Sequence, residues 1–244
     1  MEHKRTQTDK GRYYEINGVA YPSVTNILNV ISKGPALLAW AAKQGSLANM
    51  KAVQTEALNI GSEAHQLIDL YLKKLPFLLE GKDKAVIQAF DNFVQWAKEN
   101  NFELLHSEFV CFSKKWGYAG TADGLGRVNG DLCLIDWKTS SGVWDEYFLQ
   151  TEAYLQAVEE MADNKEMVDG TVFVLPQKLT HRLVLRLSKK DNTFQPALEP
   201  RNIKDFTYFL SALDLWHGMD DMKTRYSKYR PVYKKEKNVN NKSD

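Results

Sequence analysis

The chain has 244 residues and a formal net charge of +1, from 32 basic and 31 acidic side chains. Its hydrophobic fraction of 43% and charged fraction of 26% are typical of a globular protein with a buried core. No apolar run approaches the roughly 18 residues of a membrane span. The first twelve residues lack the apolar centre of a secretory signal. We therefore expect a cytoplasmic protein that is not secreted.

Charge is distributed unevenly along the chain. Residues 221–244 hold eight basic and three acidic groups, a net charge of +5, so residues 1–220 carry −4. A near-neutral total argues against a nucleic-acid binder, but the separation into an acidic body and a basic tail needs its own explanation. The simplest one is a flexible, solubilising tail.

Helical patterns dominate the first hundred residues. The pair Asn17-Gly18 is a typical hairpin turn, and Ser23 or Thr25 is suited to cap a short helix. Apolar residues then recur at three- and four-residue intervals. The predicted elements are a hairpin (11–21), a short helix ending before Gly34-Pro35, a helix restarting there, a long helix (47–74) and an amphipathic helix (83–99).

The second half contains short β-rich runs that are separated by glycines, followed by alternating helices and strands. Asp145 is the expected N-cap of the first helix in this half. The predicted elements are strands at 104–112, 116–121, 124–129 and 132–137, a helix at 145–161, strands at 170–175 and 182–187, and a helix at 202–217. This order predicts an α/β or α+β fold with a central mixed sheet and a helical N-terminal section.

The strongest chemical signal is a group of charged residues on two adjacent predicted strands. Asp123 ends one strand, and Asp136 and Lys138 lie two positions apart on the next, so they point to the same face. The preceding residues 132–135 are apolar, and charges at the end of a buried strand are costly unless they bind something. Two carboxylates favour Mg²⁺ or Mn²⁺, and the lysine can hold a water or neutralise a phosphate oxygen. A solvated ion pair and a turn aspartate are the structural alternative.

Together with its surroundings, this group resembles the motifs of the PD-(D/E)xK nuclease superfamily, most closely its RecB-like exonuclease branch. Five features match in order over about residues 60–160: Gly61-x-x-x-His65, Glu108, Gly120-x-x-Asp123, Asp136-x-Lys138 with Thr139 and Ser140, and Gln150-x-x-x-Tyr154. The segment from Tyr21 to Leu28 also resembles stand-alone members, including phage nucleases and the mitochondrial genome maintenance exonuclease. The resemblance implies a restriction-endonuclease-like core and metal-dependent hydrolysis of phosphodiester bonds.

The resemblance also implies a ligand set. His65, Asp123, Asp136 and the backbone carbonyl of Trp137 would hold the metal, and Lys138 would orient and activate the attacking water. Imidazole suits Mn²⁺ somewhat better than Mg²⁺, so a preference for Mn²⁺ is a reasonable hypothesis. Some relatives carry a four-cysteine iron–sulfur cluster, but this chain has only Cys111 and Cys133, so no such cluster is expected.

Six further residues are predicted to complete the site or to contact DNA: Glu108, Thr139, Ser140, Trp144, Gln150 and Tyr154. Glu108 would be catalytic, near the metal or positioning a basic group, or else an exposed strand residue. Gln150 and Tyr154 share a helix face and would bond phosphate oxygens or fix Lys138, or else mark a helix boundary and a half-buried tyrosine. Trp144 is the preferred candidate for stacking on a base, although large aromatics more often pack in cores.

We therefore expect a divalent-metal-dependent DNA nuclease, most simply an exonuclease acting on single strands or DNA ends in recombination and repair. A flap or junction endonuclease of the same fold, or a non-catalytic DNA-binding recombination accessory protein, is the alternative. The chain lacks a P-loop motif, so a helicase, recombinase or single-strand-binding protein would be a separate partner. Bacterial or phage-infected cytosol is the expected location, with no membrane association.

The expected organisation is one nuclease domain over residues 1–220, followed by the basic tail 221–244. Within the domain, residues 1–100 form the hairpin and helical section, and residues 101–220 form the catalytic core. The tail would supply the attraction to the DNA backbone that the acidic body lacks.

Overall fold

The structure is a computed structural model that describes residues 3–8, 11–31, 34–168 and 171–229, with the backbone alone for residues 34–38 and 220. The elements outside the central sheet are α1 (Val24–Leu28), α2 (Gly34–Lys43), α3 (Leu47–Leu72), α4 (Lys84–Glu99), α5 (Asp145–Asp163), α6 (Ile203–Arg225), β1 (His3–Thr8), β2 (Gly11–Ile16), β3 (Val19–Pro22), β7 (Met167–Val168), β8 (Thr171–Val172) and the 3₁₀ turn η1 (Ser227–Tyr229).

A five-stranded sheet forms the centre of the molecule, with strand order β10-β9-β6-β5-β4. Its strands are β4 (Glu103–Ser113), β5 (Tyr118–Val128), β6 (Asp131–Lys138), β9 (His181–Leu187) and β10 (Phe194–Pro200). The pair β6–β9 is parallel and the other neighbours are antiparallel, so the sheet is mixed. The predicted α/β class with a central mixed sheet flanked by helices is confirmed.

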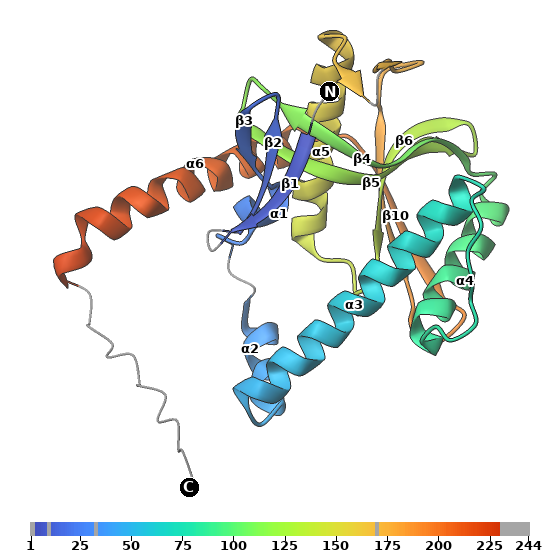
Figure 1. The fold of residues 1–244 in the computed structure, drawn as a ribbon, viewed down its shortest axis with the longest axis horizontal. Helices are drawn as coiled ribbons and strands as arrows, with labels where there is room; N and C mark the ends of the chain where they lie inside the picture. Colours follow the sequence, from blue (N-terminus) through green and yellow to red (C-terminus); the bar gives the residue numbers. More distant parts are fainter. Residues whose placement is uncertain (1–2, 9–10, 32–33, 169–170, 230–244) are drawn as a thin grey trace, which may run out of the picture.

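Helices cover both faces of this sheet (Figure 1). On one face, α3 and α4 pack over a cluster that includes Phe93, Trp96 and Trp137. On the other face, α1, α5 and α6 pack over a cluster that includes Leu125 and Leu134. Alternate residues of β6 therefore point into different cores, which is the pattern expected of a strand buried on both sides.

The N-terminal hairpin is part of a separate three-stranded antiparallel sheet, β1-β2-β3. The predicted turn is confirmed, since Asn17 and Gly18 have φ of 49° and 80°. Tyr14 anchors this small sheet to the central one, because its hydroxyl lies 2.9 Å from the Thr121 hydroxyl on β5. The capping prediction is also confirmed, because the Ser23 side chain accepts a hydrogen bond from the backbone N–H of Asn26.

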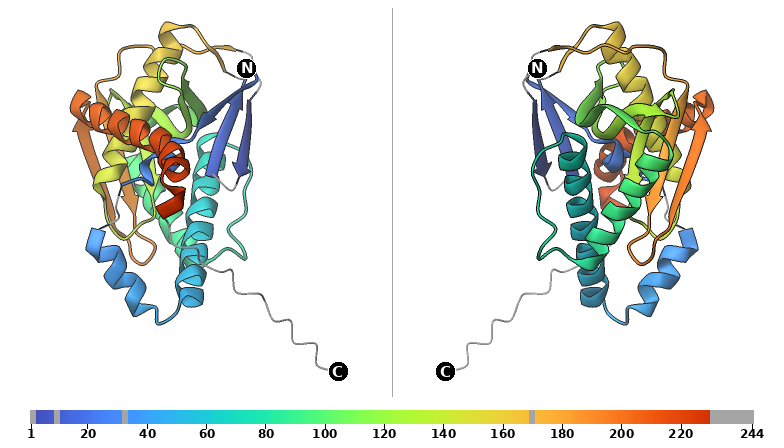
Figure 2. Two further views of the ribbon diagram at one scale, coloured as in Figure 1. Left: turned by 90° about the vertical axis from the view of Figure 1, so that its left-hand side faces the viewer. Right: turned by 90° about the vertical axis from the view of Figure 1, so that its right-hand side faces the viewer.

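The two long N-terminal helices agree closely with prediction, and α4 buries its apolar face, but the first half of α3 is largely exposed. Only the second half of α3 contributes to the core, through Ala64, Leu67 and Ile68. Val53 and Leu58 in the first half are 40% and 71% exposed. Figures 1 and 2 show α2 and the first turns of α3 projecting from the body of the molecule.

Several predicted boundaries are wrong. The two strands predicted at 116–121 and 124–129 are replaced by one continuous strand, β5, which runs from Tyr118 to Val128. The expected core strand at 170–175 is reduced to β8, which pairs only with β7; residues 169–170 lie outside the described residues. The N-cap of α5 is Trp144 rather than Asp145, and its side chain makes no capping hydrogen bond.

The sequence patterns also missed three strands, β1, β7 and β10, and part of a helix. Strands β1 and β10 form edges of the two sheets, and α6 extends to Arg225, beyond the predicted end at residue 217. The start of the predicted tail is therefore helical, while residues 230–244 lie outside the described part of the chain. Among the described residues, no helix is both long enough and apolar enough to cross a membrane.

Candidate metal and phosphodiester site

Three neighbouring strands place acidic residues in one row across the sheet. The pairs Ser107–Gly124 and Phe109–Ala122 set Glu108 of β4 opposite Asp123 of β5. The pair Gly124–Ile135 sets Asp136 of β6 at the next position beside Asp123. Residues at opposite positions share a face. The pairing of β4, β5 and β6 therefore brings together three carboxylates that lie up to 28 positions apart in the chain.

Glu108 has an unusual backbone, with φ of +47° inside a strand. A left-handed conformation costs a non-glycine residue about 1–3 kcal/mol and is typically stored at functional sites. It interrupts the regular pairing of β4 at the position opposite Asp123. The fold therefore holds a strained glutamate at the end of the acidic row.

His65 of α3 completes a group of three potential metal ligands. Its Nδ1 lies 3.5 Å from Glu108 Oε1 and 3.5 Å from Asp123 Oδ1. Ligand atoms of His65, Glu108 and Asp123 all lie within 4.8 Å of one another. One imidazole nitrogen and two carboxylate oxygens form a donor set that suits Mn²⁺ or Mg²⁺. The residues present therefore fit a divalent cation, and we refer to these three residues as the ligand triad.

The charges in the ligand triad depend on one another. Burial lowers the pKa of His65, but the carboxylates of Asp123 and Glu108 outweigh it and raise that pKa to about 10. Burial acts to raise the pKa of Asp123. The positive charge of His65 and its hydrogen bond to Asp123 outweigh burial, so the pKa of Asp123 lies below its usual value. The backbone N–H of Trp137 also donates to Asp123 Oδ2 at 2.8 Å. Without a metal, His65 is therefore a cation held by two carboxylates.

Asp136 and Lys138 form a second group beside the ligand triad. Lys138 Nζ lies 2.6 Å from Asp136 Oδ2, and 4.8 Å from the centre of the Tyr147 ring. The amide of Gln150 joins both charges, because its Nε2 donates to Asp136 Oδ1 at 3.0 Å and its Oε1 accepts from Lys138 at 3.4 Å. The same Nε2 donates to the Tyr154 hydroxyl at 3.3 Å. Gln150 of α5 therefore contacts Lys138 directly, and Tyr154 contacts Gln150; the predicted roles of both residues in the reaction stay predictions.

Burial controls the ionisation of this second group. Burial raises the pKa of Asp136 to about 7, helped by the charge of Asp123 and opposed by Lys138. Burial acts to lower the pKa of Lys138, but the charges of Asp136 and Asp123 outweigh it, so its pKa is raised. Lys138 is therefore an ammonium at neutral pH, suited to donate hydrogen bonds and to stabilise negative charge.

The strand glycines have a packing role at this site. A Cβ at Gly120 would lie 2.3 Å from Cε1 of the Tyr154 ring, and one at Gly124 would lie 2.6 Å from the Trp137 ring. Both aromatic rings therefore rest directly on the backbone of β5. On α3, a Cβ at Gly61 would lie 3.2 Å from the Thr139 hydroxyl, so glycine also permits the close approach of this helix to β6.

Gly120→Ala should therefore destabilise the protein by about 1–3 kcal/mol, because the new methyl must displace the buried Tyr154 ring. Chemical denaturation monitored by circular dichroism measures this difference. Gly218→Ala is the matched control, since nothing lies within 4 Å of its added Cβ in α6, and it should be neutral or slightly stabilising. Equal stability of the Gly120 variant and the wild type would contradict the packing role.

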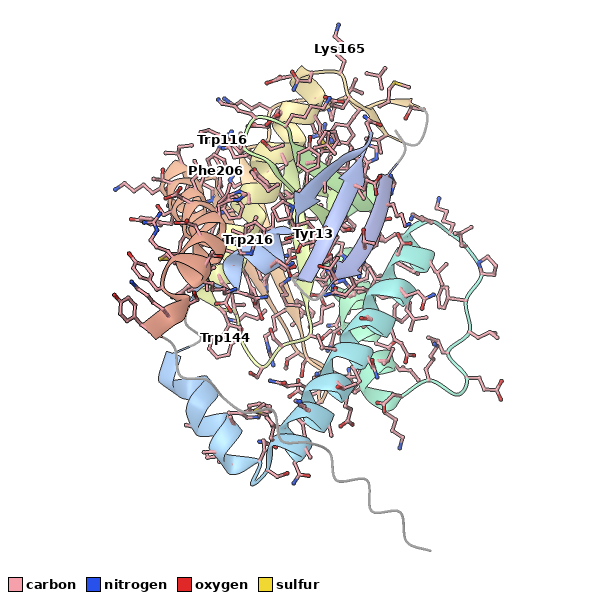
Figure 3. All side chains as sticks on the ribbon, turned by 60° about the vertical axis from the view of Figure 1, so that its left-hand side comes forward. Tyr13, Trp116, Trp144, Lys165, Phe206 and Trp216 are labelled. Atoms are coloured by element: carbon pink, nitrogen blue, oxygen red, sulfur yellow. The ribbon has the colours of Figure 1, made fainter. Side chains whose placement is uncertain are left out.

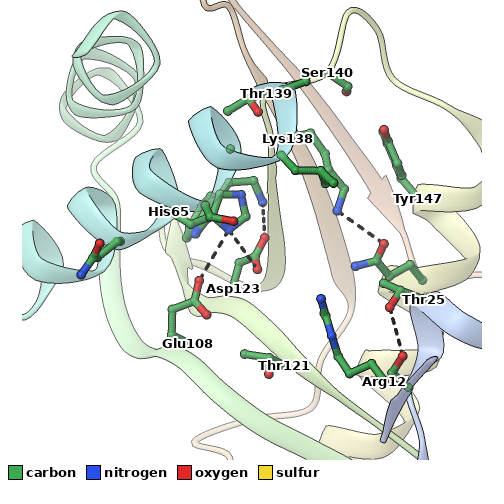
Figure 4. Close-up of a pocket in the computed structure, with 18 of the residues that line it drawn as sticks. Arg12, Thr25, His65, Glu108, Thr121, Asp123, Lys138, Thr139, Ser140 and Tyr147 are labelled. Atoms are coloured by element: carbon green, nitrogen blue, oxygen red, sulfur yellow. Dashed lines mark hydrogen bonds and ion pairs between the residues drawn. The ribbon is translucent and has the colours of Figure 1, made fainter. Parts of the chain in front are cut away.

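Both groups open into a cleft of about 1100 Å³ between α3 on one side and the N-terminal sheet, α1 and α5 on the other (Figure 4). The sequence did not single out Arg5, Arg12 or Tyr147, which also line it. Arg5 is paired with Tyr14 in the small sheet, and Arg12 lies two positions from Tyr14, so these residues share the face that meets the cleft. Figure 4 shows the Arg12 side chain pointing inwards. Within the described residues, neither guanidinium has an ion-pair partner.

The remaining predicted site residues do not all line the cleft. Thr139 and Ser140 line the cleft, and the Ser140 hydroxyl donates to the carbonyl of Gly142 at 2.7 Å. Trp144 is 45% exposed on the loop before α5, outside the cleft lining, and Figure 3 shows it among the side chains of that region. The structure groups Glu108, rather than Asp136, with His65 and Asp123. A metal contact of Asp136, and one of the Trp137 carbonyl, stay predictions.

Solved structures similar to this chain share little of its sequence. No protein-family model matches the chain, and no curated protein matches it. Among solved structures, the chain is similar to the alkaline exonuclease LHK-Exo from Laribacter hongkongensis, with 11% identity, a TM-score of 0.45, and coverage of 86% of this chain and 92% of that one. It is also similar to a candidate exonuclease from Eubacterium rectale, with 12% identity, a TM-score of 0.41, and coverage of 74% and 77%. Similarity at this level does not assign an activity, so the site's own residues must support one.

Proposed function

We propose that this protein is a divalent-metal-dependent DNA nuclease of the RecB-like branch of the PD-(D/E)xK superfamily. The observation that carries the proposal is the ligand triad of His65, Glu108 and Asp123 beside the buried Asp136 and its partly exposed ion-pair partner Lys138, all in one open cleft. Burying charged groups is costly, and a cluster of perturbed ionisable groups in a cleft is typical of a functional site. The order of these residues in the sequence matches the resemblance described above.

Each residue has a defined task in this proposal. His65, Glu108 and Asp123 would hold the metal, which supplies Lewis-acid stabilisation and a more acidic water. The Lys138 ammonium would donate to the attacking water or to a phosphate oxygen, held in place by Asp136, Gln150 and Tyr147. Arg12, which points into the same cleft, would bind a non-bridging phosphate oxygen and orient the bond to be cut.

Within this class we propose an exonuclease acting on single strands or DNA ends, in a single domain spanning residues 1–220. The cleft is bounded by α3 and the N-terminal sheet, and in this proposal a single strand passes between these two walls. A flap or junction endonuclease is the main alternative within the fold. A non-catalytic accessory protein has less support, because it would need neither a ligand triad nor a lysine held against a buried carboxylate.

A nuclease assay tests the proposal directly. Single- and double-stranded DNA and RNA, labelled at either end, are incubated with the protein and Mg²⁺, Mn²⁺ or EDTA. Metal-dependent degradation that releases nucleotides from one end supports the exonuclease. Internal cuts at flaps or junctions would establish the endonuclease instead, and binding without cleavage in any metal would favour the accessory protein.

The raised pKa of His65 links metal affinity to pH. An imidazole that binds a metal must lose its proton, and the pKa near 10 means that this proton is present at neutral pH. The apparent Kd for Mn²⁺ should therefore fall as pH rises from about 6 to about 9, by up to about tenfold per unit for one released proton. Isothermal titration calorimetry in buffers of different ionisation enthalpy measures the proton release.

His65→Gln is the control for this pH dependence, because glutamine cannot titrate in this range. It should bind Mn²⁺ more weakly and with a shallower dependence on pH. An unchanged slope in this variant would show that another group releases the proton.

A further inference from the structure

The cleft continues well beyond the ligand triad, along one face of α3. The α3 residues that line it recur at three- and four-residue spacing and therefore share that face: Gln54, Ala57, Leu58, Gly61, Ser62, His65, Gln66 and Asp69. His65 lies towards the C-terminal end of this row. At 1.5 Å per residue, the segment from Gln54 to His65 extends the cleft by about 16 Å on one side of the ligand triad. We call this extension the α3 groove.

The α3 groove differs chemically from the ligand triad. Its lining from Gln54 to Ser62 contains no carboxylate. The two glutamates of this part of α3, Glu56 and Glu63, lie outside the lining, and Glu63 is paired with Lys82 at 2.9 Å. Leu58 is 71% exposed beside small and amide side chains. An uncharged wall with an exposed apolar side chain suits sugars and bases, and it does not repel a phosphate backbone.

Lys189 supplies the positive charge of the α3 groove. It is the second residue of the connection between β9 and β10, and it lines the same cleft. Within the described residues it has no ion-pair partner, whereas its neighbour Lys190 is exposed and lies outside the lining. Burial lowers the pKa of Lys189, with Glu56 acting in the opposite direction, so an anion placed beside this amine would be stabilising.

We propose that the α3 groove binds the single DNA strand on one side of the scissile phosphate, and that Lys189 contacts a phosphate at its far end. The inference rests on the proposed function and adds a substrate path to it. At a stacked rise of 3.4 Å per nucleotide, about 16 Å corresponds to at most about five nucleotides. Lys189 therefore acts only on strands long enough to reach it.

Substrate length provides the test. Steady-state kinetics are measured for Lys189→Ala on single-stranded oligodeoxythymidylates of about four to about sixteen nucleotides. The loss relative to wild type should appear as a raised KM, should be several-fold on long strands and should shrink on the shortest ones. The salt dependence of binding to long strands should become shallower by about one unit in the slope of log Kd against log salt concentration.

Lys190→Ala is the matched control, because it removes the same charge from the adjacent, exposed position. It should show no dependence on strand length. Equal losses in the two variants, or a Lys189 loss that is the same at every length, would overturn the proposed path.

A binding assay distinguishes a failure of this inference from a failure of the proposed function. Fluorescence anisotropy with the same labelled oligonucleotides in EDTA needs no cleavage. If the wild type cleaves no substrate in any metal, but Lys189→Ala alone weakens DNA binding in a length-dependent way, the nuclease proposal is refuted and the strand path is kept. Cleavage by the wild type together with length-independent behaviour of Lys189→Ala would refute the path and keep the nuclease.

Discussion

Lys138→Ala should lower kcat for DNA cleavage by about 10²–10⁴-fold, the usual loss when a positioned proton donor or a charge-stabilising group is removed. Lys138 is the cation held by both Asp136 and Gln150, and its raised pKa keeps it charged. Steady-state cleavage of a single-stranded oligonucleotide in Mn²⁺ measures the effect. The effect should fall on kcat, because the charge is needed where negative charge develops on the phosphate.

A loss of activity in Lys138→Ala must be distinguished from a folding defect. Removing Lys138 leaves Asp136 buried without its cation, but the pKa of Asp136 is already raised to about 7, so it can take up a proton instead. Lys138 is not part of the ligand triad, and Mn²⁺ binding should survive. Lys82→Ala, which breaks a partly exposed ion pair with Glu63, should keep full activity. Retained cleavage in Lys138→Ala with intact Mn²⁺ binding would remove Lys138 from the chemistry.

Local sequence signals explain why most strands of the central sheet could be predicted. The residues of β6 form an apolar run that ends in Asp136 and Lys138, and the antiparallel pairing of β5 and β6 follows from the Asn129-Gly130 turn between them. Both signals lie within a few residues of the elements that they specify. The N-terminal hairpin and the capped start of α1 were predictable for the same reason.

The prediction divided β5 because a glycine in a strand can either mark an irregularity or allow another group to approach the backbone closely. Gly120 and Gly124 were placed in two predicted strands separated at residues 122–123, whereas the structure has one continuous strand in which each glycine admits an aromatic ring. The rings belong to Tyr154 and Trp137, and a single sequence does not show which distant residue will pack on a glycine. In the exposed first half of α3, Ala57 and Leu58 line the cleft rather than a core, and Val53 is 40% exposed outside that lining.

The missing parts of the candidate site come from tertiary contacts. Arg12 reaches the cleft because Tyr14 bonds Thr121, 107 positions along the chain. Tyr147 meets Lys138 only when the first turn of α5 packs beside β6. The left-handed backbone of Glu108 has no sequence signature, because residues other than glycine adopt it only under the constraint of their surroundings. The sequence could therefore name Glu108 but not its grouping with His65.

Asp123→Asn should remove most of the metal affinity, raising the Kd for Mn²⁺ by more than the roughly 10–100-fold typical of residues that only support a ligand. The substitution is nearly isosteric, and the amide oxygen can still accept from the backbone N–H of Trp137. The fold should therefore persist while the ligand is lost. Cleavage should fall with metal binding, and raising the Mn²⁺ concentration should restore part of it.

The same variant tests the electrostatics of the ligand triad. Asp123 supplies the largest of the effects that raise the pKa of His65, so in Asp123→Asn the His65 imidazole should titrate at a lower pH, which NMR can follow in the metal-free protein. Asp69→Asn is the control, because Asp69 lines the same cleft but bonds the Ser107 hydroxyl at 2.6 Å and pairs with Lys73. It should keep wild-type Mn²⁺ affinity. Equal affinity in Asp123→Asn and the wild type would mean that the metal binds elsewhere, because a divalent ion held by His65 and Glu108 alone would lose half of its carboxylate charge.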